Sequence, residues 1–151
     1  MPDAKEFDVL KNISPLISPD LMQLLMQMGH GDEIVLADGN FPADANAQRL
    51  VRADGLPLLP LLEAVLQLFP LDTFVDEVAF VMQPVGAPAA EPPIWTGFRH
   101  LLEEAEGRAI ALVPLDREDF YHRSRLAFGI VATSEVALYG NLILKKGVVT
   151  L

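Results

Sequence analysis

The amino-acid sequence predicts an α/β domain in which helices cover a central sheet. Short apolar runs bounded by turn residues alternate along the chain with longer segments whose apolar residues recur at helical spacing. The short runs are apolar at successive positions, which is typical of strands whose two faces are both buried beneath helices. The chain has 151 residues, a length that fits one domain with a substantial core.

The first helix is predicted at residues 18–28. It opens with Ser-Pro-Asp, in which the serine caps the helix, the proline suits its first turn and the aspartate lies near its positive end. Gly29 is expected to end it. Residues 34–37 are four apolar residues between turn signals and predict a buried strand. Residues 39–50 are predicted to be a loop, and the segment after them ends in an Asp-Gly turn at residues 54–55.

The middle of the chain predicts two helices separated by a strand. Residues 57–69 place five apolar side chains on one helical face, and residues 78–82 form a short apolar run typical of a buried strand. Residues 94–105 predict a helix that Gly107 closes. The intervening residues 85–93 are rich in proline and alanine, and we expect them to be mobile.

The remaining part of the chain continues the alternation. Apolar runs predict strands at residues 109–113, 128–132 and 142–144, and a polar helix is expected at residues 117–127. Residues 1–9 are expected to be a flexible tail, which leaves residues 10–151 as a single domain.

The composition excludes several classes of function. A net charge of −10 argues against nucleic acid as a partner, because an acidic chain repels phosphate backbones. Without cysteine the chain has no thiol nucleophile or disulfide, and it lacks paired histidines at metal-ligand spacing and glycine-rich phosphate loops, so we expect no metal or cofactor. The longest apolar stretch, residues 56–71, contains three prolines and a glutamate and is too short for a membrane span. We therefore expect a cytoplasmic protein without a signal peptide.

Three polar residues follow predicted helices or strands. His30 lies between two glycines, where it either interacts with the end of the preceding helix or transfers protons near neutral pH, as histidine does. Asp38 closes the first strand, and Asp72 follows the second long helix. Each aspartate either caps a turn or accepts hydrogen bonds from the hydroxyls of a ligand. In α/β sheets ligands bind at the carboxyl ends of strands, which is where Asp38 and Met82 are expected.

Two further groups lie in the second half of the chain. Arg117 and Tyr121 are one helical turn apart in a segment that is otherwise typical of a solvated helix face. Tyr139 and Asn141 flank a glycine before an apolar strand, as in a hairpin turn. Together with His30 and the carboxylates, these side chains suit proton transfer on a neutral ligand that carries several hydroxyls.

Four blocks of the sequence resemble the family that contains the L-fucose mutarotases and the D-ribose pyranases. They occur in the family's order and extend from about residue 10 to residue 148: SPLISPDLMQLLMQMGHGDEIVLAD, RADGLPLLPLLEAVLQLFPLDT, REDFYHRSRLAF and ALYGNLILKKGV. The resemblance implies a three-layer α/β fold. It also implies assembly into a ring-type homo-oligomer, often a decamer, with sites near subunit contacts.

The resemblance also assigns roles to residues. It implies that His30 and Tyr121 are catalytic and that a monosaccharide is bound by Asp38, Asp72, Met82, Arg117, Tyr139 and Asn141. At position 117 this chain has arginine and resembles the members that act on fucose, whereas members that act on ribose tend to have histidine there.

The expected reaction interconverts the α and β anomers of L-fucose. A base removes the proton of the anomeric hydroxyl while an acid protonates the ring oxygen, and the open aldehyde rotates before the ring closes. We expect the first strand to place Asp38 beside His30. Two alternatives remain open at this point: an enzyme of the same family that interconverts pyranose and furanose forms of D-ribose, and a non-catalytic sugar-binding accessory protein.

Overall fold

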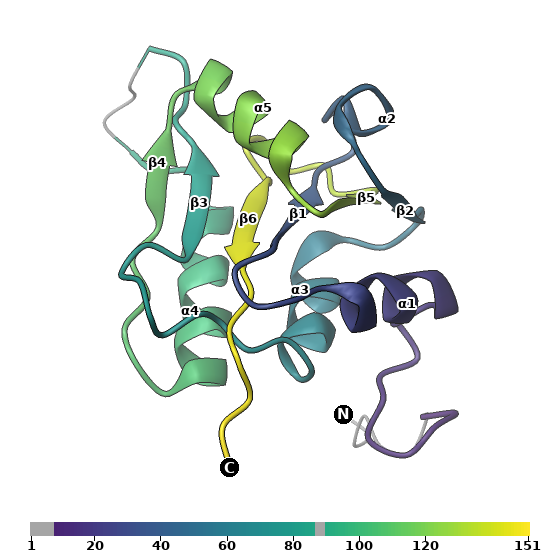
Figure 1. The fold of residues 1–151 in the computed structure, drawn as a ribbon. Helices are drawn as coiled ribbons and strands as arrows, with labels where there is room; N and C mark the ends of the chain where they lie inside the picture. Colours follow the sequence, from purple (N-terminus) through teal and green to yellow (C-terminus); the bar gives the residue numbers. More distant parts are fainter. Residues whose placement is uncertain (1–7, 87–89) are drawn as a thin grey trace.

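The structure is a computed structural model that describes residues 8–86 and 90–151 (Figure 1). Within these residues the chain forms one six-stranded sheet and five helices. The strands are β1 (Glu33–Ala37), β2 (Leu50–Ala53), β3 (Ala79–Met82), β4 (Val113–Leu115), β5 (Gly129–Thr133) and β6 (Leu142–Lys145). The helices are α1 (Pro19–Gln27), α2 (Ala43–Asn46), α3 (Leu58–Leu66), α4 (Ile94–Glu106) and α5 (Arg117–Leu126).

The sheet has the strand order β2-β5-β1-β6-β3-β4. β6 pairs antiparallel with both β1 and β3, whereas the other neighbouring strands pair parallel. The five parallel strands therefore end at one end of the sheet, which we call the carboxyl end, and begin at the opposite amino end. β6 runs the other way, so it starts at the carboxyl end and finishes at the amino end.

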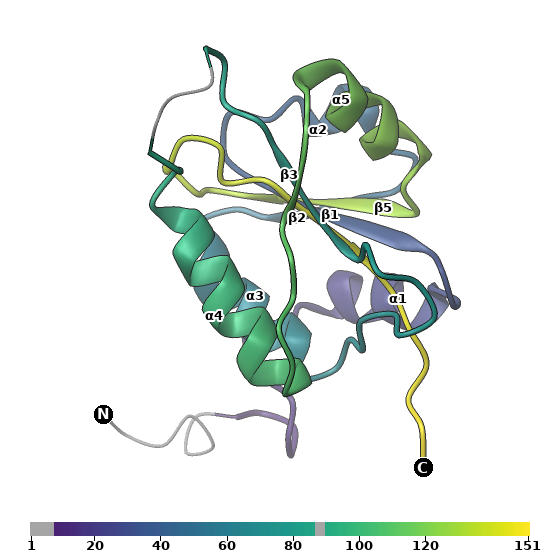
Figure 2. The same ribbon diagram turned by 90° about the vertical axis from the view of Figure 1, so that its left-hand side faces the viewer.

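Helices cover both faces of the sheet (Figure 2). α1, α3 and α4 pack on one face, where the larger apolar cluster includes Ile34 and Leu36 of β1. α2 and α5 lie on the other face, where Val35 and Ala37 join the second cluster. Since successive side chains of a strand point to opposite faces, β1 is buried on both sides. The predicted three-layer α/β domain is confirmed.

Most predicted elements lie within a few residues of the observed ones, but the strand predicted at residues 109–113 is wrong. The observed strand β4 begins only at Val113 and includes Pro114, and residues 109–112 are not part of a strand. Ile110 is nevertheless buried in the larger apolar cluster. Proline is tolerated in β4 because this strand lies at the edge of the sheet and pairs on one side only.

The predicted loop at residues 39–50 contains the short helix α2, and the strand β2 follows it. A four-residue helix is too short to show a periodic pattern, which explains why the sequence did not indicate it. Residues 1–7 of the predicted tail and residues 87–89 of the proline-rich segment lie outside the described residues. None of the helices in the described part of the chain is long and apolar enough to cross a membrane.

Candidate active site

A cleft of about 250 Å³ opens at the carboxyl end of the sheet. This volume is just below the range of about 300–1,000 Å³ that is common for small-ligand sites. Six of the eight predicted site residues line the cleft: Asp38, Met82, Arg117, Tyr121, Tyr139 and Asn141. They come together because β1, β3 and β4 end here while β6 begins here.

Asp38 and Asn141 form a buried, reciprocal pair in this cleft. The backbone N–H of Asp38 donates to Oδ1 of Asn141 at 2.8 Å, and Nδ2 of Asn141 donates to Oδ2 of Asp38 at 3.1 Å. Asn40 donates its backbone N–H to the other carboxylate oxygen at 3.0 Å. Burial raises the pKa of the Asp38 carboxyl above its ordinary value, although these hydrogen bonds act in the opposite direction. The pair therefore presents a fixed carboxylate to the cleft.

Tyr139 is held at both of its ends. Its backbone carbonyl accepts a hydrogen bond from the indole N–H of Trp95 at 3.3 Å, and its hydroxyl accepts one from the backbone N–H of Val85 at 3.0 Å. The residue has a φ of 58°, in the left-handed region that residues other than glycine seldom adopt. The two contacts from α4 and from the segment after β3 thus fix this aromatic wall of the cleft.

Arg117 and Tyr121 lie on the first turns of α5, whose cap Asp116 accepts from the backbone N–H of Asp119 at 2.8 Å. Nε of Arg117 donates to the hydroxyl of Tyr121 at 3.3 Å, and the guanidinium carbon lies 5.4 Å from the centre of the tyrosine ring. Among the described residues Arg117 has no acidic partner, so its remaining N–H groups face the cleft and the solvent. Phe41, which the sequence interpretation missed, packs its ring 5.5 Å from that of Tyr121.

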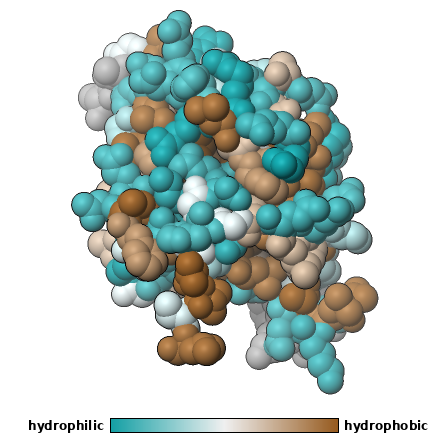
Figure 3. Space-filling model, in the orientation of Figure 1, coloured by the Kyte–Doolittle hydropathy of each residue, from teal (hydrophilic) through white to brown (hydrophobic). Residues whose placement is uncertain are grey.

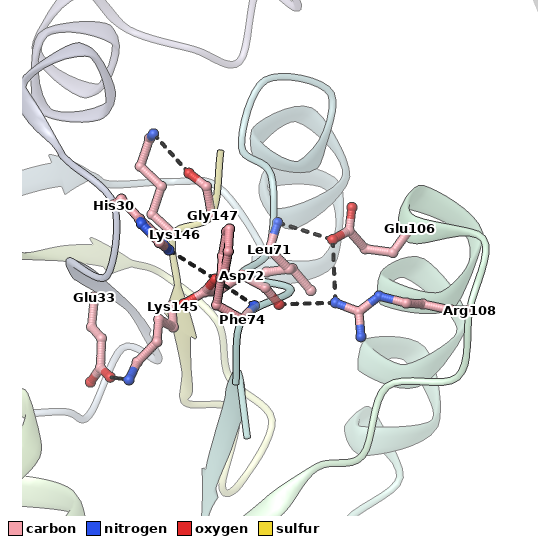
Figure 4. Close-up of polar contacts among 10 residues, drawn as sticks. All are labelled: His30, Glu33, Leu71, Asp72, Phe74, Glu106, Arg108, Lys145, Lys146 and Gly147. Carbon is pink, nitrogen blue, oxygen red and sulfur yellow. Dashed lines mark hydrogen bonds and ion pairs between the residues drawn. The ribbon is translucent and has the colours of Figure 1, made fainter. Parts of the chain in front are cut away.

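His30 lies elsewhere, in a tight turn at the amino end of the sheet (Figure 4). The turn is closed by a hydrogen bond from the backbone N–H of Asp32 to the carbonyl of Gly29 at 3.2 Å. Gly31 has a φ of 88°, a conformation that glycine adopts without strain. The His30 side chain is 43% exposed, and its Nε2 lies 3.0 Å from Oδ1 of Asp72. Its ring also contacts that of Phe74, with the centres 5.1 Å apart.

Asp72 belongs to this second cluster and not to the carboxyl-end cleft. Its side chain is 4% exposed, and the same Oδ1 that contacts His30 accepts the backbone N–H of Phe74 at 3.0 Å. The Phe74 N–H, and then His30, hold the pKa of the Asp72 carboxyl below its ordinary value despite burial. The sequence-predicted residues therefore form two groups: six in the cleft, and His30 with Asp72 at the amino end.

The expectation that β1 places Asp38 beside His30 is wrong within one chain. His30 precedes β1 and Asp38 follows it, and the strand between them spans roughly 16 Å at about 3.3 Å per residue. β6 bridges the same distance from Asn141 to Lys146. A single monosaccharide cannot contact both groups in one copy of the chain.

Another cleft, of about 670 Å³, contains none of the eight predicted residues. It runs beside α5 and contains a two-armed ion pair in which Arg123 donates to both carboxylate oxygens of Glu33, at 2.8 and 2.7 Å. The described part of the chain has no cluster of three or more histidine, aspartate or glutamate side chains that could hold a metal ion.

Comparison with known proteins gives concordant matches over almost the whole chain. Residues 11–149 match the RbsD / FucU transport protein family. The fucose mutarotase of Homo sapiens is 50% identical over 148 residues, which cover 94% of this chain and 96% of that protein. The L-fucose mutarotase of Haemophilus influenzae (strain 86-028NP) is 44% identical over 140 residues, 93% of this chain and 97% of that protein.

Solved structures show the same relationship. A crystal structure of the fucose mutarotase in complex with L-fucose from Streptococcus pneumoniae superposes with a TM-score of 0.88 at 48% identity, covering 93% of this chain and all of that one. The structure of Bacillus subtilis RbsD complexed with D-ribose gives a TM-score of 0.68 at 21% identity, covering 89% and 95%. At 21% identity, the match to RbsD supports a shared fold and nothing further.

Proposed function

Because this chain belongs to the RbsD / FucU transport protein family, we propose that it is an isomerase that interconverts the α and β anomers of L-fucose. The observation that carries the proposal is the polar cleft at the carboxyl end of the sheet, in a chain 48% identical to a mutarotase that binds L-fucose. The cleft offers a carboxylate, an amide, a guanidinium and two phenols, which are hydrogen-bonding groups suited to several hydroxyls of one neutral sugar.

The reaction needs two proton transfers. One group takes the proton of the anomeric hydroxyl, another gives a proton to the ring oxygen, the C1–O5 bond breaks, and the reverse transfers close the ring on the other face of the aldehyde. We assign the two transfers to His30 and Tyr121, with Asp38, Arg117, Tyr139 and Asn141 holding the remaining hydroxyls. A well-placed acid or base contributes about 10²–10⁴-fold, and fixing the sugar's orientation adds to this.

The separation of His30 from Tyr121 suggests that residues from two copies of the chain form the site. Since the two lie at opposite ends of the sheet, we propose that His30 of one copy enters the carboxyl-end cleft of a neighbouring copy. Apolar side chains are exposed at both ends: Phe74 at 75% and Val149 at 73% at the amino end, Val85 at 75% and Leu138 at 74% at the carboxyl end. Apolar residues interrupt the hydrophilic surface at the lower side of the face in Figure 3, where the C-terminal residues lie.

Exposed apolar surface of this kind is typical of protein interfaces. The proposed assembly is a ring-type homo-oligomer, for which a decamer is the expected size. We place it in the cytoplasm, whose reducing conditions are compatible with a chain that has no cysteine.

The test measures exchange between the anomer signals of L-fucose by saturation-transfer NMR. The wild-type protein should accelerate exchange, and the folded His30→Ala and Tyr121→Phe variants should each lose most of it. If the two residues of one site come from different copies, co-expression of the two variants should restore activity in about one quarter of the sites by random pairing.

Three outcomes would contradict parts of the proposal. Absence of any recovery in the mixed assemblies would show that His30 of one copy and Tyr121 of another do not form a shared site. Exchange between pyranose and furanose forms of D-ribose, without fucose exchange, would favour the ribose enzyme. Saturable binding of fucose without any acceleration by the wild-type protein would indicate a binding protein.

A further inference from the structure

The cluster around His30 carries an inference that rests on the proposed function. We propose that Asp72 is a positioning residue and does not bind the sugar. Its carboxylate holds the His30 imidazole in the tautomer that has the proton on Nε2, so that Nδ1 is the nitrogen that accepts and returns the substrate's proton.

The geometry of the pair supports this assignment. An ionised carboxylate only accepts hydrogen bonds, and the N–H of Phe74 keeps the pKa of Asp72 low, so that the carboxylate is ionised near neutral pH. Nε2 of His30, at 3.0 Å from Oδ1, must therefore carry the proton. Within the described part of the chain no group is bonded to Nδ1, and 43% of the imidazole side chain is exposed.

Asp72 is poorly placed to contact a sugar. Its side chain is only 4% exposed, and Oδ1 already accepts from two donors. The imidazole contacts this carboxylate and also the ring of Phe74, to which it is tilted by 53°. A ligand that approaches the amino end therefore meets His30 and Phe74 before it meets Asp72.

The backbone that carries Asp72 is fixed by elements distant in sequence (Figure 4). Glu106, at the end of α4, accepts the backbone N–H of Leu71 at 3.0 Å, and Nη2 of Arg108 donates to the carbonyl of Asp72 at 3.1 Å. The carbonyl of Lys145, at the end of β6, accepts the backbone N–H of Asp72 at 3.1 Å. Helix α4 and strand β6 thus determine where the carboxylate lies, and through it the orientation of His30. Such preorganisation fixes the catalytic nitrogen before substrate binds.

The test combines kinetics with a spectroscopic measurement. Asp72→Ala removes the oxygen that accepts from both the Phe74 N–H and Nε2 of His30, so that nothing holds the ring proton on Nε2. The expected loss is about 10–100-fold in kcat, with KM for L-fucose within about twofold because uniform binding is unchanged. Asp76→Ala, at an exposed aspartate in the same segment, is the matched control and should change neither.

Long-range ¹H–¹⁵N NMR of the His30 ring reports the tautomer without any need for activity. The wild-type protein should show the proton on Nε2, and Asp72→Ala should lose this preference. A wild-type proton on Nδ1 would overturn the proposal even if the variant does not fold. A raised KM with unchanged kcat would overturn it as well, since that result indicates direct sugar binding. If the wild-type protein exchanges no sugar, the proposed function fails while the tautomer result still decides the role of Asp72.

Discussion

Replacing Asn141 by alanine tests the pair on which the carboxyl-end cleft depends. Asn141 is 4% exposed and Asp38 is 8% exposed. The substitution removes the acceptor of the Asp38 backbone N–H and one donor to the Asp38 carboxylate. The Asp38 carboxylate keeps the Asn40 N–H as a donor, whereas the Asp38 backbone N–H loses its partner. We therefore expect both a loss of stability and a loss of anomer exchange.

The size of the stability loss follows from the two hydrogen bonds. A buried N–H left without a partner costs about 1–3 kcal/mol, and a hydrogen bond to a charged group contributes about 1.5–3 kcal/mol. Because water near the cleft can replace part of the second bond, the expected decrease in the free energy of unfolding is about 2–4 kcal/mol. Asn46→Ala is the matched control. Its amide also makes two hydrogen bonds, to the Pro42 carbonyl and from Arg125, but at an exposed site, so its cost should be about 0.5 kcal/mol or less.

The loss should also depend on pH in a defined direction. Burial raises the pKa of Asp38 from 3.8, so the stability linked to this group is fully present below that value and is lost as the pH rises through the folded-state pKa. Asn141 donates to the ionised form, and removing it raises the pKa further. The destabilisation should therefore be larger near pH 7 than near pH 3.5, which lies below the ordinary pKa of 3.8.

Urea unfolding at both pH values, at one protomer concentration because association contributes to stability, measures the effect. The two values lie on either side of the pI of about 4.6, where the protein would tend to precipitate. Equal losses for Asn141→Ala and Asn46→Ala, or a loss for Asn141→Ala that is the same at both pH values, would refute the reasoning.

Three further predictions concern substrate choice, the amino-end cluster and assembly. Arg117→His should lower the ratio of L-fucose to D-ribose exchange, measured by saturation transfer on both sugars, because fewer donors then face the hydroxyls; an unchanged ratio would show that Arg117 does not set specificity. Gly147→Ala should destabilise the fold by about 1–3 kcal/mol and reduce exchange, because its Cβ would lie 2.5 Å from the Leu71 carbonyl oxygen and 2.8 Å from Cα of Asp72. The control is Gly29→Ala, whose Cβ would be 3.7 Å from its nearest neighbour. In urea unfolding this control should be close to the wild-type protein. Sedimentation should show a homo-oligomer, and a species of 16.5 kDa alone at micromolar concentration would contradict it.

The elements that were predictable from the sequence are those whose pattern is local. In α3, Leu58, Leu61, Leu62 and Val65 recur at helical spacing and are all fully buried. The prediction of a strand at residues 109–113 was wrong because the apolar run shows only that this segment packs in the core. Which residues pair with the neighbouring strand depends on the rest of the sheet. β4 pairs with Phe80, Val81 and Met82 through residues 113–115, and periodicity contains no information about that register.

The residues of the candidate site also differ in how far local sequence patterns could place them. Asp38 and Met82 were placed correctly because both follow strands that alternate with helices, and such strands are parallel. Asn141 precedes its strand, so its position at the same end depends on β6 being antiparallel, which the sequence pattern does not reveal. The contact between His30 and Asp72 joins residues 42 positions apart. Only the three-dimensional fold brings them together.

The antiparallel strand β6 has a mechanical consequence for catalysis. Leu142, Ile143 and Leu144 are completely buried. Asn141 at one end of this strand holds Asp38, while the carbonyls of Lys145 and Lys146 at the other end accept the backbone N–H groups of Asp72 and Gly31. Because close-packed interiors deform little, the two halves of the proposed site have a fixed spacing within one chain. The distance from His30 of one copy to the cleft of the next is therefore set by the packing between copies, and mild dissociation should abolish anomer exchange before any subunit unfolds.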